Sequence, residues 1–429
     1  MVPGNIREYE FKFTLPGCPL VSSDLGGVDQ VVVIPALAER DTLPATLASL
    51  ARNAAAELGR TLILCVINNR GPHAASFRDI KNNQQTIQYL QALIKGVKGD
   101  FPGDGDGPSR GGKILPTPLR LAYIDASSPG REMPDKCGGV GAARKIGLDG
   151  ALQLFDYGLP NEKLLISLDA DSLVADNYLS AIRSHFGLGR AAAAVVNYRH
   201  QQPISARHRL AIRNYDIFLN YYVLGLRYAG SPYAFHTIGS TMVCTADAYV
   251  AVGGMNRRDA AEDFYFLNKL AKFQPISCIR TTAVHPSARP SRRVPFGTGK
   301  RVIRFLEAGE DEWQLYDPRI FSLLKGWLEA MSSSPERETE DIMALAGLID
   351  PLLPAFLEAH QFPTSWSKIK RNCRQRAGLL RQFHSWFDAF KTLKMVHFLT
   401  DHGFPQVDMF TALEGLFQLM GRREQGPSL

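Results

Sequence analysis

Apolar runs of strand length alternate with helical and loop segments along the first 200 residues. The clearest runs are VVVIP from Val31, LILCVIN from Leu62, RLAYIDA from Arg120 and AAAAVVNY from Ala191. Apolar side chains fill successive positions in these runs, which predicts strands buried on both faces. Such strands, separated by helices, indicate an α/β fold with a mostly parallel mixed sheet flanked by helices.

The pattern changes to a helical period near residue 305. Amphipathic stretches follow at 317–331, 339–360 and 407–421, and no strand-like run accompanies them. We therefore predict an α/β domain over 1–304 and an α-helical domain over 305–429. Within the first domain, residues 96–117 are rich in Gly and Pro, which predicts a mobile insertion that is either disordered or a flap.

Two segments leave acidic side chains at the edge of a hydrophobic element. LLISLDADSL ends a predicted strand on Asp169 and Asp171, and AAEDFYFLNKLAK opens a helix with Glu262 and Asp263. Period-two alternation puts the two aspartates on the same side of an extended backbone. A hard divalent cation takes one or two carboxylates together with substrate phosphates, so the pattern favours diphosphate chemistry. The alternative is a turn that caps the next helix.

The ends of the predicted strands carry further polar residues. Residues 35–39, 68–70 and 169–171 each follow an apolar run. Ligands of open α/β sheets collect at the carboxyl ends of the strands. This favours a binding site over a set of unrelated turns.

Four segments together resemble the family 2 glycosyltransferases with a GT-A fold. They are IPALAER from Ile34, GGVGAARKIGLDGAL from Gly138, LDAD from Leu168, and the segment from Gly239 to Asp263. The resemblance covers roughly residues 28–300. It implies that 1–304 is a catalytic domain of a metal-dependent enzyme, a hexosyltransferase, that moves a sugar from a nucleoside diphosphate to a hydroxyl acceptor.

The resemblance also implies roles for individual residues. Asp171 should bind Mn²⁺ or Mg²⁺ that bridges the donor phosphates, and Asp169 should contact the ribose or diphosphate. Arg144 is similar to the family's arginine that reaches the donor nucleotide. Asp263 resembles the base that deprotonates the acceptor, with Glu262 beside it in the catalytic pair.

The first two strand ends supply the remaining predicted donor contacts. These are Pro35, Ala36 and Glu39 after the first strand and Asn69 after the second. The family commonly has acidic residues near Asn69. An amide presents donors as well as acceptors, which leaves the preferred nucleobase open.

The segment after the acidic helix combines a histidine with many arginines. His285 could complete the metal site, which would favour manganese because imidazole suits Mn²⁺ better than Mg²⁺, or it could be a hydrogen-bonded histidine at a strand end. Arg293 and Arg301 flank the PFGTG turn and are predicted to bind the donor diphosphate. A basic interdomain linker is the alternative for this segment.

Three functions remain as hypotheses. An inverting glycosyltransferase, in which Asp263 is the base, is the favoured hypothesis. A retaining GT-A enzyme acting on a glycerate or phosphoglycerate acceptor shares the aspartates and the late histidine. A sugar nucleotidyltransferase would require a Gly-rich phosphate loop after the first strand, and ALAER contains no glycine.

Charge and cysteine usage limit partners and location. The net charge is +7, and much of the excess lies in the basic stretch 368–381, which is a solvated helix face or a contact for an anionic membrane or acceptor. The sequence contains no basic motif interleaved with aromatic residues, so a nucleic-acid partner is not predicted. The six cysteines show no paired metal spacing, and the amino terminus lacks a signal-peptide core. We therefore predict a cytoplasmic protein. It would be peripherally membrane-associated if the stretch 368–381 binds lipid. The oligomeric state is left open.

Overall fold

The chain divides into two compact units. The computed structural model describes residues 2–13, 20–22, 26–71, 73–96, 118–136, 138–189, 191–291, 293, 297–308 and 313–421. The first unit comprises Met1–Pro203 and Thr237–Lys300, and the second comprises Ile204–His236 and Arg301–Leu429. Residues 97–117 of the predicted insertion lie outside the described residues.

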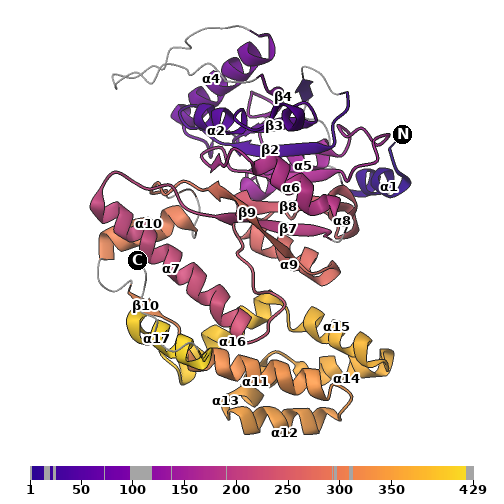
Figure 1. The fold of residues 1–429 in the computed structure, drawn as a ribbon, viewed down its shortest axis with the longest axis vertical. Coiled ribbons are helices and arrows are strands. Elements are labelled where there is room, and N and C mark those ends of the chain that lie inside the picture. The colour runs from indigo at the N-terminus through magenta and orange to yellow at the C-terminus, as the bar shows by residue number, and fades with distance from the viewer. Residues whose placement is uncertain are drawn as a thin grey trace. The chain divides into compact units, whose positions relative to one another are not determined.

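One mixed sheet organises the first unit (Figure 1). Among the described residues its strand order is β1-β4-β3-β2-β5-β8-β7-β9-β6. The strands β4, β3, β2 and β5 run parallel to one another, and β8 runs antiparallel to both β5 and β7. The strands are β1 (Leu20–Ser22), β2 (Gln30–Ala36), β3 (Thr61–Asn68), β4 (Arg120–Ala126), β5 (Leu164–Ser167), β6 (Leu173–Val174), β7 (Ala193–Tyr198), β8 (Met242–Thr245) and β9 (Ser277–His285).

Every residue of β2 and β3 is buried, which shows that both faces of this sheet are covered. Val32 belongs to a core cluster with Leu47, Leu90 and Ile182 from three helices on one face. On the other face α5 approaches so closely that a Cβ at Gly147 would lie 2.3 Å from Val33. The helices are α1 (Gly4–Phe13), α2 (Leu43–Leu50), α3 (Ala55–Leu58), α4 (Phe77–Ile94), α5 (Val140–Ala151), α6 (Tyr178–Gly187), α8 (Ala246–Ala251) and α9 (Glu262–Phe273).

A buried polar cluster fixes the amino-terminal helix to α5. The hydroxyl of Tyr9 donates to Asp149 at 2.8 Å and accepts from Lys145 at 2.9 Å. Tyr249 donates to the same Asp149 oxygen at 2.7 Å. Burial raises the pKa of Tyr9, so the phenol remains a donor. The cluster thereby anchors α5 at Lys145, the residue next to Arg144.

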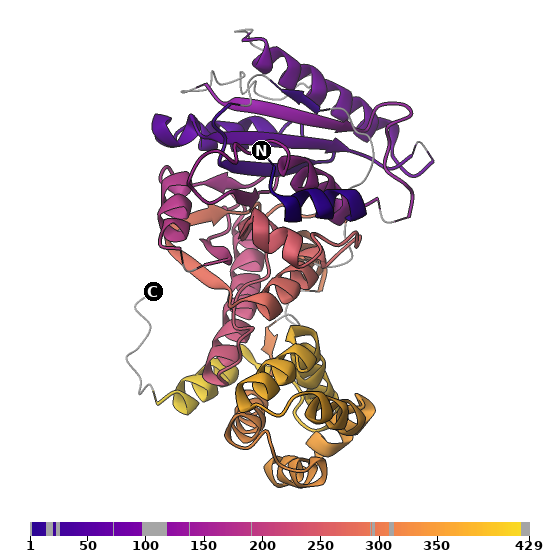
Figure 2. The same cartoon turned by 90° about the vertical axis from the view of Figure 1, so that its right-hand side faces the viewer.

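The second unit is built from helices, coloured magenta for α7 and orange to yellow for the rest (Figure 2). Its core contains buried aromatic residues that include Trp327, Phe356 and Trp366. The elements are α7 (Ala206–Tyr228), α11 (Arg319–Ser333), α12 (Thr339–Ile349), α13 (Leu352–Ala359), α14 (Phe362–Asn372), α15 (Arg376–Trp386), α16 (Ala389–His402), α17 (Met409–Leu419) and the two short strands β10 (Gln314–Leu315) and β11 (Val407–Asp408). Helix α10 (Thr298–Ala308) begins in the first unit and continues into the second.

The predicted fold class is confirmed: a mostly parallel mixed sheet flanked by helices is followed by an α-helical region. The observed division differs from the sequence-based domains in α7, which the sequence placed within 1–304. Tyr221 and Leu226 of α7 pack in the core that contains Phe321 and Leu324 of α11, so this helix belongs to the second unit. Within the described part of the chain, no helix is both long and apolar enough to cross a membrane.

Candidate functional site

The loop after β2 has a strained backbone that Asn83 of helix α4 supports. Ala38 has a φ of 52°, which is uncommon for a residue other than glycine. Its backbone N–H donates to the side-chain oxygen of Asn83 at 2.8 Å, and the amide nitrogen of Asn83 donates to Asn68 O at 3.0 Å and Asn69 Oδ1 at 2.8 Å. Asn83, which the sequence did not single out, therefore joins the loops that follow β2 and β3.

Two of the predicted donor contacts in this region are buried within β2. Pro35 and Ala36 both have buried side chains. Asn69 is buried as well, and its side-chain nitrogen donates to Arg70 O at 2.8 Å. Contact of these three residues with a donor remains a prediction.

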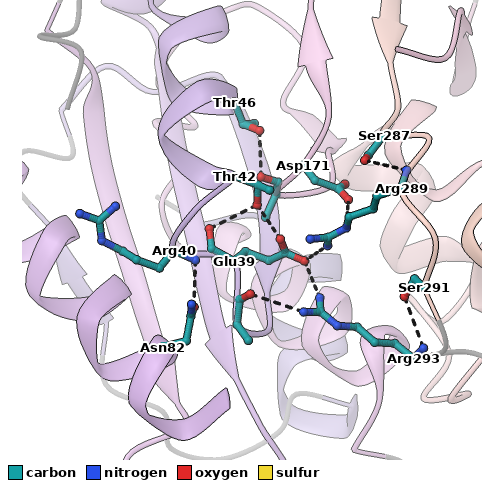
Figure 3. Close-up of polar contacts among 12 residues, drawn as sticks. Glu39, Arg40, Thr42, Thr46, Asn82, Asp171, Ser287, Arg289, Ser291 and Arg293 are labelled. Atoms are coloured by element: carbon teal, nitrogen blue, oxygen red, sulfur yellow. Dashed lines mark hydrogen bonds and ion pairs between the residues drawn. The ribbon is translucent and has the colours of Figure 1, made fainter. Parts of the chain in front are cut away.

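A chain of ion pairs surrounds Glu39 at the end of the sheet (Figure 3). The Arg289 guanidinium contacts Glu39 with one terminal nitrogen, while its Nε lies 2.9 Å from Asp171 Oδ2. Arg293 lies 2.5 Å from the same Glu39 oxygen. The other oxygen of Glu39 accepts from Thr42 Oγ1 at 2.5 Å. Three segments far apart in sequence thus bring two carboxylates and two guanidinium groups together.

The two predicted metal ligands lie on neighbouring backbone segments. His285 pairs with Leu173, two residues after Asp171, across the antiparallel strands β6 and β9. The side-chain nitrogen of Gln201 donates to the carbonyl oxygens of both Asp171 and His285 at 2.8 Å. His285 Nδ1 lies 2.9 Å from Arg199 O, and because a carbonyl oxygen only accepts, Nδ1 is the donor and Nε2 is the ring nitrogen left for another partner. Metal binding by His285 remains a prediction.

Arg144 connects Asp169 with the acidic start of helix α9. Its guanidinium contacts Glu262 through one nitrogen and Asp169 through another. Arg144 and Glu262 are buried, whereas the Asp169 side chain is 35% exposed. Gly239 makes room for this arrangement, because a Cβ there would lie 2.3 Å from the Arg144 guanidinium.

Helix α9 begins with two carboxylates in different surroundings. Glu262 follows Ala261, which has a φ of 57°, and its carboxylate is paired with Arg144. Asp263 is half-buried and accepts a hydrogen bond from the backbone N–H of Phe264 at 2.8 Å. Burial raises the pKa of Asp263, Arg144 opposes this and the charge of Asp169 adds to it. A carboxylate of this kind can accept a proton.

The donor atoms present fit a hard cation in an open site. Among the described residues there is no group of three or more His, Cys, Asp or Glu side chains that could hold a metal ion. Asp171 and Glu39 nevertheless supply oxygen ligands, and the cationic Arg289 already lies between them. An ion such as Mg²⁺ or Mn²⁺ takes one or two carboxylates and completes its shell with phosphates and water. These residues could hold it in that manner.

The two predicted diphosphate arginines lie in different units. Arg293 belongs to the cluster around Glu39 in the first unit. Arg301 belongs to the second unit, where its guanidinium lies 4.9 Å from the centre of the Phe218 ring. Donor contact by either arginine remains a prediction.

Asp171→Asn is expected to stabilise the protein increasingly between pH 4 and 6. Burial raises the pKa of Asp171 to about 6, Arg289 opposes this, and the charges of Asp169 and Glu39 add to it. The folded state therefore binds more protons than the unfolded state above about pH 4, and wild-type stability falls as pH rises through this window. Urea unfolding should show a gain of about 1–3 kcal/mol for the variant at pH 7 relative to pH 4.

Asp176→Asn provides the matched control for this prediction. Asp176 lies shortly after Asp171 in the chain, is 70% exposed and pairs only with Arg52 in the part of the chain described here. Its replacement should change stability little across the same pH range. A constant difference between Asp171→Asn and wild type from pH 4 to 7 would contradict the raised pKa.

Comparison with known proteins gives a distant likeness in structure alone. No protein-family model matches the sequence, and no curated protein sequence matches it. The fold is similar to residues 1–349 of S. aureus TarS in complex with UDP-GlcNAc, with 12% identity, a TM-score of 0.40, and coverage of 82% of this chain and 90% of that one. It is also similar to the mannosyltransferase PcManGT from Pyrobaculum calidifontis in complex with GDP-Man and Mn²⁺, with 12% identity, a TM-score of 0.38, and coverage of 96% and 93%.

Proposed function

We propose that the protein is a metal-dependent glycosyltransferase that moves a sugar from a nucleoside diphosphate to a hydroxyl acceptor. The observation that carries the proposal is the junction made by Arg144, whose guanidinium contacts Asp169 at the strand end and Glu262 at the start of α9. Asp263 directly follows Glu262 in this helix and is a half-buried carboxylate whose pKa is raised. One guanidinium therefore links Asp169, which is predicted to contact the ribose or diphosphate, with the helix end that carries the predicted base.

In the proposed reaction each residue has a separate task. Asp263 accepts the proton of the acceptor hydroxyl while that oxygen attacks the anomeric carbon from the face opposite the leaving group. The bond from this carbon to the diphosphate breaks, and the nucleoside diphosphate leaves with the electron pair. Arg144, Arg289 and Arg293 offer guanidinium partners to the phosphates. A metal ion held by Asp171 would neutralise charge on the departing diphosphate.

Inversion is the proposed outcome, with the catalytic machinery in the part of the predicted domain 1–304 that forms the first unit, Met1–Pro203 and Thr237–Lys300. A retaining reaction with a glycerate-like acceptor is the competing outcome, and the configuration of the new glycosidic bond, read by NMR, separates the two. A nucleotidyltransferase would instead release pyrophosphate from a nucleoside triphosphate and a sugar phosphate.

A thermal-shift screen of nucleoside diphosphate sugars, with and without Mn²⁺, tests the proposed function. A ligand at 100 times its Kd should stabilise the protein by about 2.7 kcal/mol, and the shift should depend on Mn²⁺. The Asp171→Ala variant is the control and should lose the metal-dependent part. If no nucleoside diphosphate sugar shifts the melting temperature, the proposed function is wrong.

We also propose that the basic stretch 368–381 is a peripheral contact for anionic membranes. Lys370 pairs with Glu338 at 2.8 Å and Arg376 pairs with Glu336 at 3.2 Å, whereas Lys368, Arg371 and Arg381 are exposed. Co-sedimentation with anionic vesicles tests this contact, and neutral vesicles are the control. Equal binding to both kinds of vesicle would contradict it.

A further inference from the structure

The Arg289 guanidinium occupies a position between two carboxylates that belong to different loops (Figure 3). Glu39 follows β2, and Asp171 lies between β5 and β6. Their side chains are 7% and 18% exposed, whereas that of Arg289 is 36% exposed. The anionic groups are thus held inside the protein, and the cation reaches them from the more exposed side.

We propose that Glu39 and Asp171 form one cation-binding pair, and that Arg289 is the internal cation that a divalent metal ion replaces. This inference rests on the proposed function for the identity of the metal. It adds Glu39 as a second carboxylate ligand for the metal ion. Arg289 then competes with the metal ion for these two carboxylates. A guanidinium cannot lose its charge in a protein, so it can yield this position only by moving.

The Glu39 carboxylate and the Asp171 backbone both have partners other than Arg289. Thr42 donates to one oxygen of Glu39 at 2.5 Å, and Gln201 holds the backbone of Asp171 at 2.8 Å. Arg289 comes from the segment after β9, and its backbone N–H donates to Ser287 Oγ at 3.3 Å. Movement of the Arg289 side chain would therefore leave the Glu39 carboxylate and the Asp171 backbone held by these bonds.

Competition for this pair links metal binding to donor binding. A metal ion alone must displace Arg289 from two carboxylates without providing it with another anion. A donor diphosphate supplies that anion, so the ion and the donor should each strengthen the binding of the other. Because such coupling is reciprocal, it can be measured from either ligand.

Titration of the protein with Mn²⁺ alone, followed by the EPR signal of the free ion, tests the inference. Arg289→Gln should bind Mn²⁺ at least about tenfold more tightly than wild type, because Glu39 and Asp171 then lack the cation that bridges them. Arg289→Lys keeps the charge and should stay close to wild type. Arg293→Gln, which removes a contact to Glu39 but none to Asp171, should have a smaller effect than Arg289→Gln.

Two further measurements complete the test. Adding UDP or GDP should tighten Mn²⁺ binding in wild type by a larger factor than in Arg289→Gln. Adding Glu39→Gln to Arg289→Gln should abolish the gain in Mn²⁺ affinity.

Unchanged Mn²⁺ affinity in a folded Arg289→Gln variant, verified by circular dichroism, would overturn the inference. Tight Mn²⁺ binding by that variant, together with no binding of any nucleoside diphosphate by the wild-type protein, would support the cation pair and contradict the proposed function.

Discussion

Asp263→Asn is expected to lower the rate of sugar transfer by about two to four orders of magnitude, the usual range for a general base. The carboxamide keeps the shape of the side chain and cannot accept the proton. Donor binding should survive, because the guanidinium of Arg144 contacts Glu262 and Asp169 rather than Asp263. Single-turnover transfer and calorimetry with the nucleoside diphosphate measure the two effects separately.

The pH profile of the wild-type enzyme provides an independent check. Burial raises the pKa of Asp263, so the rate should fall on the acidic side as this group becomes protonated. That acidic limb should be altered in Asp263→Asn. Near-normal transfer by the variant would exclude the base role and favour the retaining alternative.

Most of the first unit was predictable because its strands carry an unambiguous signal. Continuous apolar runs give β2 and β3, in which every residue is buried. The membership of α7 in the second unit was not predictable from periodicity. Its helical pattern is visible in the sequence, but its partners, such as Phe321, lie far away along the chain.

The acidic residues of the site could be located from sequence, but their partners could not. The spacing of Asp169 and Asp171 marks a strand end, whereas the contact between Glu39 and Arg289 joins residues 250 positions apart. Asn83 and Gln201 each hold two backbone segments together, and neither belongs to a recognisable motif. Such supporting residues become visible only when the topology brings the loops together.

Arg144→Ala is expected to destabilise the protein by about 3–5 kcal/mol and to weaken donor binding. Arg144 and Glu262 are both buried, and removal of one partner leaves the other as an unpaired buried charge. Urea unfolding measures the loss of stability, and calorimetry with nucleoside diphosphate and Mn²⁺ measures binding. A loss of stability below about 1 kcal/mol would show that Glu262 finds another partner or takes up a proton.

The double variant Arg144→Ala/Glu262→Ala separates the structural role of Arg144 from its role in binding. Removing both partners eliminates the unpaired carboxylate, so the double variant should be at least about 1 kcal/mol more stable than Arg144→Ala. Donor affinity should remain low, because the guanidinium that would contact the nucleotide is still missing. If donor affinity returns together with stability, Arg144 only positions α9 against α5, and another residue must bind the donor.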